Sequence, residues 1–276
     1  MHPTPVWDHV VINTQDRTDE AVAAFEKLGF TMTPRGYHSM GSINNLAIFG
    51  TDYLELIGIP PGGNDERLGL FRFPRGLNGL VFGTDASHEV AAAAEAAGLP
   101  LQPPREFSRP VDLGGGAMED AKFRTINLAA GAVDYGRVYF CHHYTRHLVW
   151  RDEWRRHRNG ALGIARAMIV SSDADKTAEV YRKLFGNEMV SRVAGGFTLA
   201  VGLSRLDIVD EGEARKQFGD ALPDAAGRAT WMAALTLRTC SLDVAKAALG
   251  SAATPVRGGL VVPAAAAFGV TLEFVA

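Results

Sequence analysis

Two polar residues that could do chemistry lie inside apolar, strand-like runs near the N-terminus. His9 belongs to VWDHVVIN, and Glu55 stands between Leu54 and Leu56 in YLELIG. Successive strand side chains point to opposite faces, so Glu55 faces the interior if both leucines face a helix layer. A carboxylate buried there needs a metal ion, a proton or hydrogen bonds. The alternatives are an exposed Glu55 and a His9 that is simply a hydrogen-bonded core histidine.

A second group of polar residues follows on the next strand-like run. His38 could act as the general acid or base that an enolising or epimerising reaction at a carbonyl needs. Asn44 and Asn45 come after a Gly-Ser turn and either bind substrate or satisfy loop backbone groups. We predict catalytic roles for Glu55 and His38, and a substrate-binding role for Asn45.

The segment 142–158 mixes histidines and arginines with two tryptophans. Forked guanidinium groups could hold a carboxylate or phosphate of a substrate. The alternative, which we favour, is a connector whose Trp150 and Trp154 hold two halves together while its arginines are solvated. The patch is short and the remaining chain is not basic, so nucleic-acid binding is disfavoured.

Other catalytic signatures are not met. Three glycines at 114–116 precede neither a helix nor a lysine, so they indicate a turn rather than a phosphate-binding loop. The sequence has no G-x-S-x-G motif and no CxxC pair. A nucleophilic hydrolase and a structural zinc site are therefore set aside.

The elements that must position these residues form an internal repeat. Four short amphipathic segments each end at a glycine, a residue suited to the left-handed conformation that closes a helix: Gly29, Gly98, Gly186 and Gly250. A β-rich run precedes each segment, and strand-like runs with glycine breaks follow it. The pattern predicts a βαβββ unit repeated four times, with no doubly wound parallel sheet.

Comparing the four units gives two columns of residues. YLELIG, RLDIVD and TLEFVA align as the last strands, which places Glu55, Asp207 and Glu273 in one column, with Tyr139 of RVYFCH in the second unit. Aligning the helix-terminal glycines gives a first-strand column of His9, Gly79, Ala167 and Trp231. Only the first unit has a histidine in that column.

Composition limits the partners. The 276 residues are 47% hydrophobic and carry a formal charge of −3, so no basic field attracts nucleic acid or an anionic membrane. Apolar runs fall short of the roughly 20 residues that span a bilayer, and the first residues do not resemble a secretory signal. Two cysteines in separate units suggest free thiols. We expect a cytoplasmic protein with a small-molecule substrate, no nucleic-acid or membrane partner, and a homodimer as one option.

The chain resembles glyoxalase-like proteins of the vicinal oxygen chelate superfamily. The resemblance rests on WDHVVI, KLGF, the Gly-Tyr-His segment and YLELIG in the first unit, and on YFCHHYTRHLVWRDEWRRHRNGA further along. It implies an α+β fold in which four βαβββ modules form two barrels. The implied domains are residues 1–150 (modules one and two) and 151–276 (modules three and four, a degenerate copy).

The resemblance also implies a metal site, because ligands in metal-dependent members come from the first and last strands of each module. Carried over, this selects His9 and Glu55. The second module departs from the pattern, since Gly79 has no ligand atom and Tyr139 is only an occasional ligand. We predict His143 as the third ligand because it shares strand parity with Tyr139 and with Cys141. The remaining two, Tyr139 and His142, are assigned to the substrate.

The preferred hypothesis is therefore a metal-dependent lyase, isomerase or dioxygenase acting on a small oxygenated molecule. The ion is expected to be divalent, with zinc, nickel, iron, manganese and cobalt left open. The alternative is a metal-free protein that binds or sequesters a small molecule, with Tyr37, Phe140 and Trp231 lining its cup. A third option is a scaffold whose only role is assembly.

Overall fold

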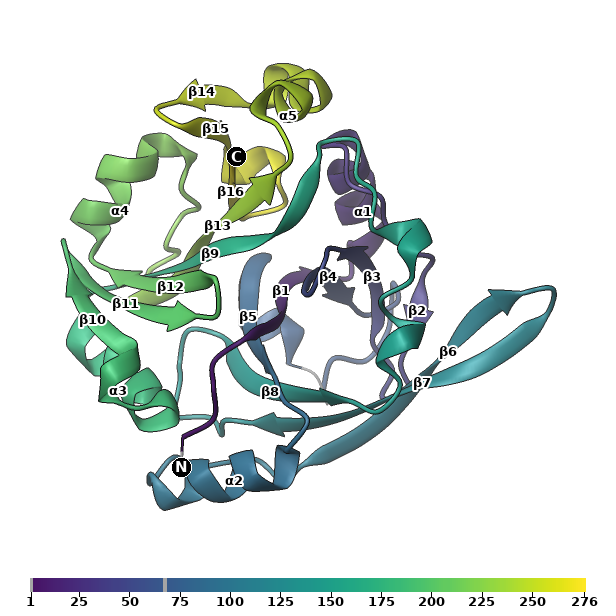
Figure 1. Ribbon diagram of the computed structural model, residues 1–276, viewed down its shortest axis with the longest axis horizontal. Helices are drawn as coiled ribbons and strands as arrows, with labels where there is room; N and C mark the ends of the chain where they lie inside the picture. Colours follow the sequence, from purple (N-terminus) through teal and green to yellow (C-terminus); the bar gives the residue numbers. More distant parts are fainter. Residues whose placement is uncertain (1, 67–68) are drawn as a thin grey trace.

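The computed structural model of the chain, which describes residues 2–66 and 69–276, contains two eight-stranded sheets flanked by helices (Figure 1). The first sheet has the order β2-β3-β4-β1-β5-β8-β7-β6. Its strands are β1 (Trp7–Gln15), β2 (Gly36–Tyr37), β3 (Ile43–Ile48), β4 (Tyr53–Gly58), β5 (Gly76–Gly83), β6 (Arg105–Gly114), β7 (Ala117–Asn127) and β8 (Arg137–His143).

The second sheet repeats this topology strand for strand. Its order is β10-β11-β12-β9-β13-β16-β15-β14. The strands are β9 (Ala161–Ser171), β10 (Val190–Val193), β11 (Gly196–Val201), β12 (Ser204–Val209), β13 (Thr230–Thr239), β14 (Thr254–Val256), β15 (Gly259–Val262) and β16 (Thr271–Val275). The same order in both sheets confirms the predicted α+β architecture of four βαβββ modules.

Each module contributes the predicted helix between its first two strands. These helices are α1 (Thr18–Lys27), α2 (Ser87–Ala96), α3 (Ala174–Phe185) and α5 (Leu242–Leu249). All four glycines that were expected to follow them have a positive φ, between 55° and 95°. A further helix that the repeat did not predict, α4 (Glu211–Phe218), follows β12 and buries Ala214 and Phe218 in an apolar cluster of the second half.

The first sheet curves into a nearly closed barrel. The backbone N–H of Ser39, after β2, donates to the carbonyl of Ser108 on β6 at 3.2 Å, which links the two edges of the sheet. The β6–β7 hairpin then extends beyond the body of the molecule (Figure 1). Because the barrel wall is made of strands, residues of alternate parity face its interior.

Strand alternation places the core and the site on opposite faces of the wall. Leu54 and Leu56 belong to a large apolar core outside the barrel, whereas Glu55 lines the cavity inside it, as predicted. That outer core is continuous with the second half: Phe82 packs against Phe185 at a ring-centroid distance of 4.7 Å. A domain boundary at residue 150 stays a prediction, because one apolar core joins the two halves.

Two further features bear on the expectations from composition. Both cysteines are free thiols; Cys141 is buried and Cys240 is exposed. Within the described residues, no helix combines the length and the apolar character that crossing a membrane would require.

Candidate functional site

The first barrel contains a small cavity of about 100 Å³ that is partly open to solvent. Its wall combines aromatic and aliphatic side chains with a few polar groups, which is the usual make-up of a small-molecule site. Among the lining residues are His9, His38, Glu55, Arg109, Phe107 and Tyr139. The cavity therefore gathers three of the residues that sequence reasoning selected for chemistry, together with Tyr139.

His9 is held in a fixed orientation by its chain neighbour. Strands β1 and β5 lose register between Trp7 and His9, so Asp8 is the extra residue of a β-bulge. The bulge turns Asp8 so that its Oδ1 accepts from His9 Nδ1 at 2.5 Å. The other ring nitrogen, Nε2, then faces the cavity, 3.1 Å from the hydroxyl of Tyr139. Sequence reasoning missed Asp8 because simple alternation sends it to the opposite face.

Asp8 is a charged group in the protein interior. Burial disfavours its ionised form, but the charges and hydrogen bonds of His143 and His9 outweigh that effect and lower the pKa of Asp8 below its usual range. The carboxylate is therefore an acceptor at neutral pH, and His9 Nδ1 must donate to it. A histidine whose Nδ1–H is bound to a carboxylate presents Nε2 with its lone pair, the arrangement typical of metal-ligating histidines.

Glu55 lies on the same side of the cavity as the His9 nitrogen. Its Oε2 is 3.6 Å from His9 Nε2, and its Oε1 accepts from the Asn44 side-chain amide at 2.7 Å. Two ligand atoms that are each about 2.1 Å from one divalent ion lie roughly 3 to 4 Å apart. The pair thus fits a shared ion, with the Tyr139 hydroxyl as a third candidate ligand atom nearby.

His38 also lines the cavity, as predicted. Its Nδ1 is 2.7 Å from the hydroxyl of Ser42, and its Nε2 is 3.3 Å from the Asn44 amide nitrogen. Burial lowers the pKa of His38 to about 4; the negative charge of Glu55 opposes this effect, and the positive charge of Arg109 adds to it. His38 is therefore an uncharged imidazole at neutral pH.

His143 is not brought to His9 Nε2 and Glu55. Its Nε2 instead lies 2.9 Å from Asp8 Oδ1, so both imidazoles share one carboxylate oxygen. Among the described residues, the group of three that could ligate one ion is Asp8, Cys141 and His143, with ligand atoms within 4.8 Å of one another. Cys141 and His143 lie together, as the parity argument implied, but the structure places His143 behind His9 and not beside Glu55, where the third ligand was predicted.

Two predicted substrate contacts lie outside the cavity. Asn45 points outward, with its amide nitrogen donating to Thr33 O at 2.8 Å and its oxygen accepting from Arg35 at 2.6 Å. Its neighbour Asn44 has the inward parity and contacts Glu55 instead. His142 lies on the outer face of β8, where its Nδ1 is 3.4 Å from the Ser87 hydroxyl at the start of α2.

The aromatic lining proposed for a metal-free cup is wrong as well. Tyr37 is 62% exposed, Phe140 faces the core outside the barrel, and Trp231 lies in the second half. The aromatic residues that do line the cavity include Tyr53, Phe107 and Phe123. Phe107 and Phe123 stack at 5.1 Å on the β6–β7 hairpin, a cross-strand pair that only the hairpin register creates.

Part of the segment 142–158, which was predicted to be a connector, packs into the first barrel. Its Trp150 packs on Tyr53 and His143 inside the first barrel, at ring-centroid distances of 5.3 and 5.0 Å. The guanidinium of Arg146 lies 3.4 Å over the Trp150 ring. This part of the connector therefore plugs one end of the first barrel, and the prediction that Trp150 holds the halves together is wrong.

The second barrel has an arginine where the first has His9. Parallel pairing sets Val11 opposite Glu55, and in the same way sets Met168 opposite Asp207. Two residues before Met168 is Arg166, so Arg166 and not Ala167 matches His9. In the last module Thr236 lies opposite Glu273, which makes Ala234 rather than Trp231 the match. The glycine alignment failed there because the strand-to-glycine spacing is shorter, partly because α5 has 8 residues whereas α1 has 10.

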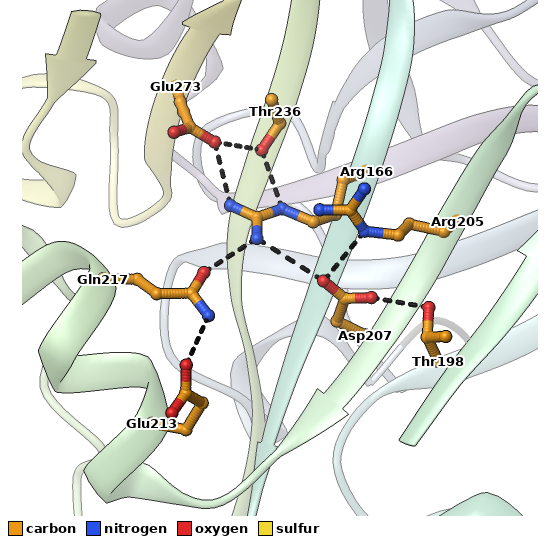
Figure 2. A network of polar contacts seen from close by, with 8 residues as sticks. All are labelled: Arg166, Thr198, Arg205, Asp207, Glu213, Gln217, Thr236 and Glu273. Carbon is orange, nitrogen blue, oxygen red and sulfur yellow. Dashed lines mark hydrogen bonds and ion pairs between the residues drawn. The ribbon is translucent and has the colours of Figure 1, made fainter. Parts of the chain in front are cut away.

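The Arg166 guanidinium is fully partnered (Figure 2). Its Nη2 donates to Glu273 at 2.8 Å, its Nε to the Thr236 hydroxyl at 3.0 Å, and its Nη1 lies 3.4 Å from Asp207. Nη1 also donates to Gln217 of α4 at 2.8 Å. Arg205 Nε also donates to Asp207 at 3.1 Å, so the two column carboxylates of the second barrel face two cations of the chain itself. The absence of a metal from the second half stays a prediction, and Arg166 supplies a physical reason for it that the sequence columns missed.

Comparison with known protein families identifies the family of this chain. The profile of the family described as a glyoxalase-like domain matches residues 7–185, more than half of the chain. The chain belongs to the glyoxalase-like domain family. The predicted resemblance is therefore confirmed. None of the curated proteins matches the sequence of this glyoxalase-like chain.

Solved structures share its architecture over nearly its whole length. A hypothetical protein from Staphylococcus aureus matches with a TM-score of 0.69 at 12% identity, covering 97% of this chain and 98% of that one. A mutant of 4-hydroxymandelate synthase from Streptomyces coelicolor matches with a TM-score of 0.57 at 13% identity, covering 99% and 92%. A xylose isomerase-like TIM barrel/4-hydroxyphenylpyruvate dioxygenase fusion protein gives 0.59 at 11%, covering 99% and 49%. At such identities the likeness shows the fold alone.

Proposed function

We propose that this glyoxalase-like protein is an enzyme that acts on a small oxygenated molecule, with a divalent ion bound by His9 and Glu55 in the first barrel. The observation that carries the proposal is the arrangement of one imidazole: Asp8 holds His9 Nδ1, and His9 Nε2 faces Glu55 Oε2 across 3.6 Å inside a cavity. Two of the solved structures with this fold have dioxygenases or synthases in their names, which is consistent with small-molecule chemistry in such barrels.

The residues around His9 and Glu55 have separate roles in the proposed reaction. A bound divalent ion would polarise a substrate carbonyl and acidify the neighbouring C–H bond. Glu55 and His38 both present atoms to the cavity that can accept a proton and return it. Asn44 fixes the Glu55 carboxylate through Oε1, and Tyr139 can donate its hydroxyl proton to His9 Nε2 or to a substrate oxygen.

A competing location for the ion lies behind His9. Asp8, Cys141 and His143 offer oxygen, sulfur and nitrogen atoms within reach of one ion, beside a larger cleft of about 660 Å³ between the halves. An ion there would have to displace the hydrogen bonds that Asp8 makes to both imidazoles. Binding at His9 Nε2 leaves those hydrogen bonds intact, so we assign the ion to the cavity side.

Metal analysis of protein purified without chelator tests the proposal. We expect one equivalent of divalent metal in the wild type and its loss in His9→Ala and in Glu55→Gln. His142→Ala is the matched control, because His142 lies on the outer face of β8 and should leave the metal content unchanged. Metal retained in His9→Ala but lost in Cys141→Ser would move the site behind His9. A metal-free wild type that also takes up no added Zn²⁺ or Ni²⁺ would favour the binding-protein alternative.

A further inference from the structure

Arg109 on β6 is a buried cation that faces the cavity without a partner. Its side chain is one of the lining groups, and the residue is only 5% exposed. Nη2 is fully buried and has no hydrogen-bond partner among the described residues. This is unusual, because buried guanidinium groups in folded proteins are normally paired with carboxylates or carbonyl oxygens.

The protein maintains this group at a cost. Burial lowers the pKa of Arg109, while Tyr53 and Glu55 act in the opposite direction. No ion pair within 4.0 Å joins Arg109 to a described carboxylate. Glu55, the carboxylate of the same cavity, accepts a hydrogen bond from the Asn44 amide instead. An unpaired charge in such a place destabilises the folded state, so an apolar residue would be the better choice for stability alone.

Cations outnumber carboxylates among the described residues that line the cavity. Arg105 and Arg137 also line it, and Arg137 has its Nε and Nη2 buried without partners. The lining contains one carboxylate, that of Glu55. Three guanidinium groups facing a single carboxylate create a positive potential that favours an anionic ligand.

Backbone geometry makes room for Arg109. A Cβ atom at Gly36 of β2 would lie 3.1 Å from Cδ and 3.3 Å from Nη1 of Arg109, and only 2.2 Å from Oδ1 of Asn44. Any side chain at this position would therefore displace both Arg109 and the asparagine that holds Glu55. The space for the guanidinium is built into the barrel where β2 approaches β6.

We propose that the substrate of this site is a small organic carboxylate whose anionic group is bound by Arg109. The inference rests on the proposed function for the location of the substrate, and it adds the chemical class. A cavity of about 100 Å³ is smaller than the roughly 150 Å³ cavity that accommodates benzene in an engineered protein. The part of the substrate inside the barrel is accordingly an aliphatic acid of about three or four carbons. Planar, bidentate pairing of guanidinium with carboxylate supplies the specificity.

Pyruvate and its uncharged amide, pyruvamide, are the probes that test this class. We expect pyruvate to bind the wild type at least ten times more tightly than pyruvamide in a calorimetric titration. Arg109→Met should abolish this preference, and Arg109→Lys should retain part of it because the charge remains. Arg257→Met, at an exposed turn of the second half, is the control and should keep the full preference.

The outcomes separate this inference from the metal site. Equal affinity for the two probes, no measurable binding of pyruvate, or a preference that persists in Arg109→Met would each overturn the anion site. Repeating the titration in His9→Ala, which should lack metal, should preserve a preference for pyruvate that depends on Arg109. If Arg109→Met unfolds, the preference of the wild type for pyruvate and the reduced preference of Arg109→Lys still test the anion site.

Discussion

The two barrels share one topology but treat buried charge in opposite ways. In the second barrel Arg166 replaces His9 and is bound by Asp207, Glu273, Thr236 and Gln217 (Figure 2). In the first barrel His9 Nε2 contacts Tyr139 and Glu55 at the wall of a cavity, and Arg109 Nη2 beside it has no partner among the described residues. The comparison shows two uses of one barrel. A barrel interior occupied by its own arginine contributes to stability, whereas an interior with a cavity and unpaired polar groups is suited to binding a ligand.

The largest effect should come from breaking the filled cup. Arg166→Met leaves the half-buried Glu273 without its cation and the buried Asp207 with only the exposed Arg205, so we expect the free energy of unfolding to fall by about 3 kcal/mol in urea denaturation. Arg257→Met should change it by less than about 0.5 kcal/mol. A loss below about 1 kcal/mol in Arg166→Met would mean that the second cup does not depend on its arginine.

The next effect concerns the orientation of His9 in the first cup. Asp8→Asn removes the carboxylate that holds His9 Nδ1, so the affinity for Zn²⁺ should fall by about 10- to 100-fold in a competitive titration. Asp85→Asn, at an exposed position before α2, should have no effect. Unchanged affinity in Asp8→Asn would show that the bulge at Asp8 has no role in metal binding.

A third test uses histidine, which only the first half and the connector contain. All eight histidines precede residue 158. The pKa of His38 is about 4 in the folded chain and about 6.5 in the unfolded chain, so the unfolded chain binds the extra proton between these values. The free energy of unfolding should therefore fall as the pH decreases from 6.5 to 4, and His38→Gln should reduce that slope.

The control for the pH effect is His147→Gln, because this histidine is exposed. We expect it to keep the wild-type slope in urea unfolding measured across the same pH interval. Identical slopes for wild type and His38→Gln would contradict the lowered pKa of His38.

The smallest effect on stability should be at the unpaired arginine. Arg109→Met replaces a buried cation that has no partner, so the free energy of unfolding should stay constant or rise by about 1 kcal/mol. This contrasts directly with Arg166→Met, which makes the same chemical change in the other barrel. A loss of stability similar to that of Arg166→Met would show that Arg109 has structural partners and would remove the contrast.

Features set by local rules could be predicted from the sequence. The alternation of Leu54, Glu55 and Leu56 correctly placed the carboxylate inside the barrel, because a strand buried on both faces still alternates. Glycines such as Gly29 and Gly186 marked the helix ends because they adopt a positive φ. These two signals were enough to define four modules.

Features set by irregularity or by distant contacts could not be predicted. The bulge that turns Asp8 toward His9 adds one residue to β1, which reverses the parity on which the sequence argument relied. Asn45 was preferred to Asn44 without a register to separate them. Arg109 reaches the cavity only because β6 approaches β2, a long-range contact with no local signature. The arginine inside the apolar run IARAMIVSS was the one signal that could have identified Arg166.

Anomalous diffraction from crystals soaked in Co²⁺ tests the central claim most directly. We predict one strong anomalous peak per chain, about 2.0 to 2.2 Å from His9 Nε2 and from a Glu55 oxygen, and none beside Asp207 and Glu273. A peak among Asp8, Cys141 and His143, or a peak in the second barrel, would contradict the assignment of the ligand site to the first cup.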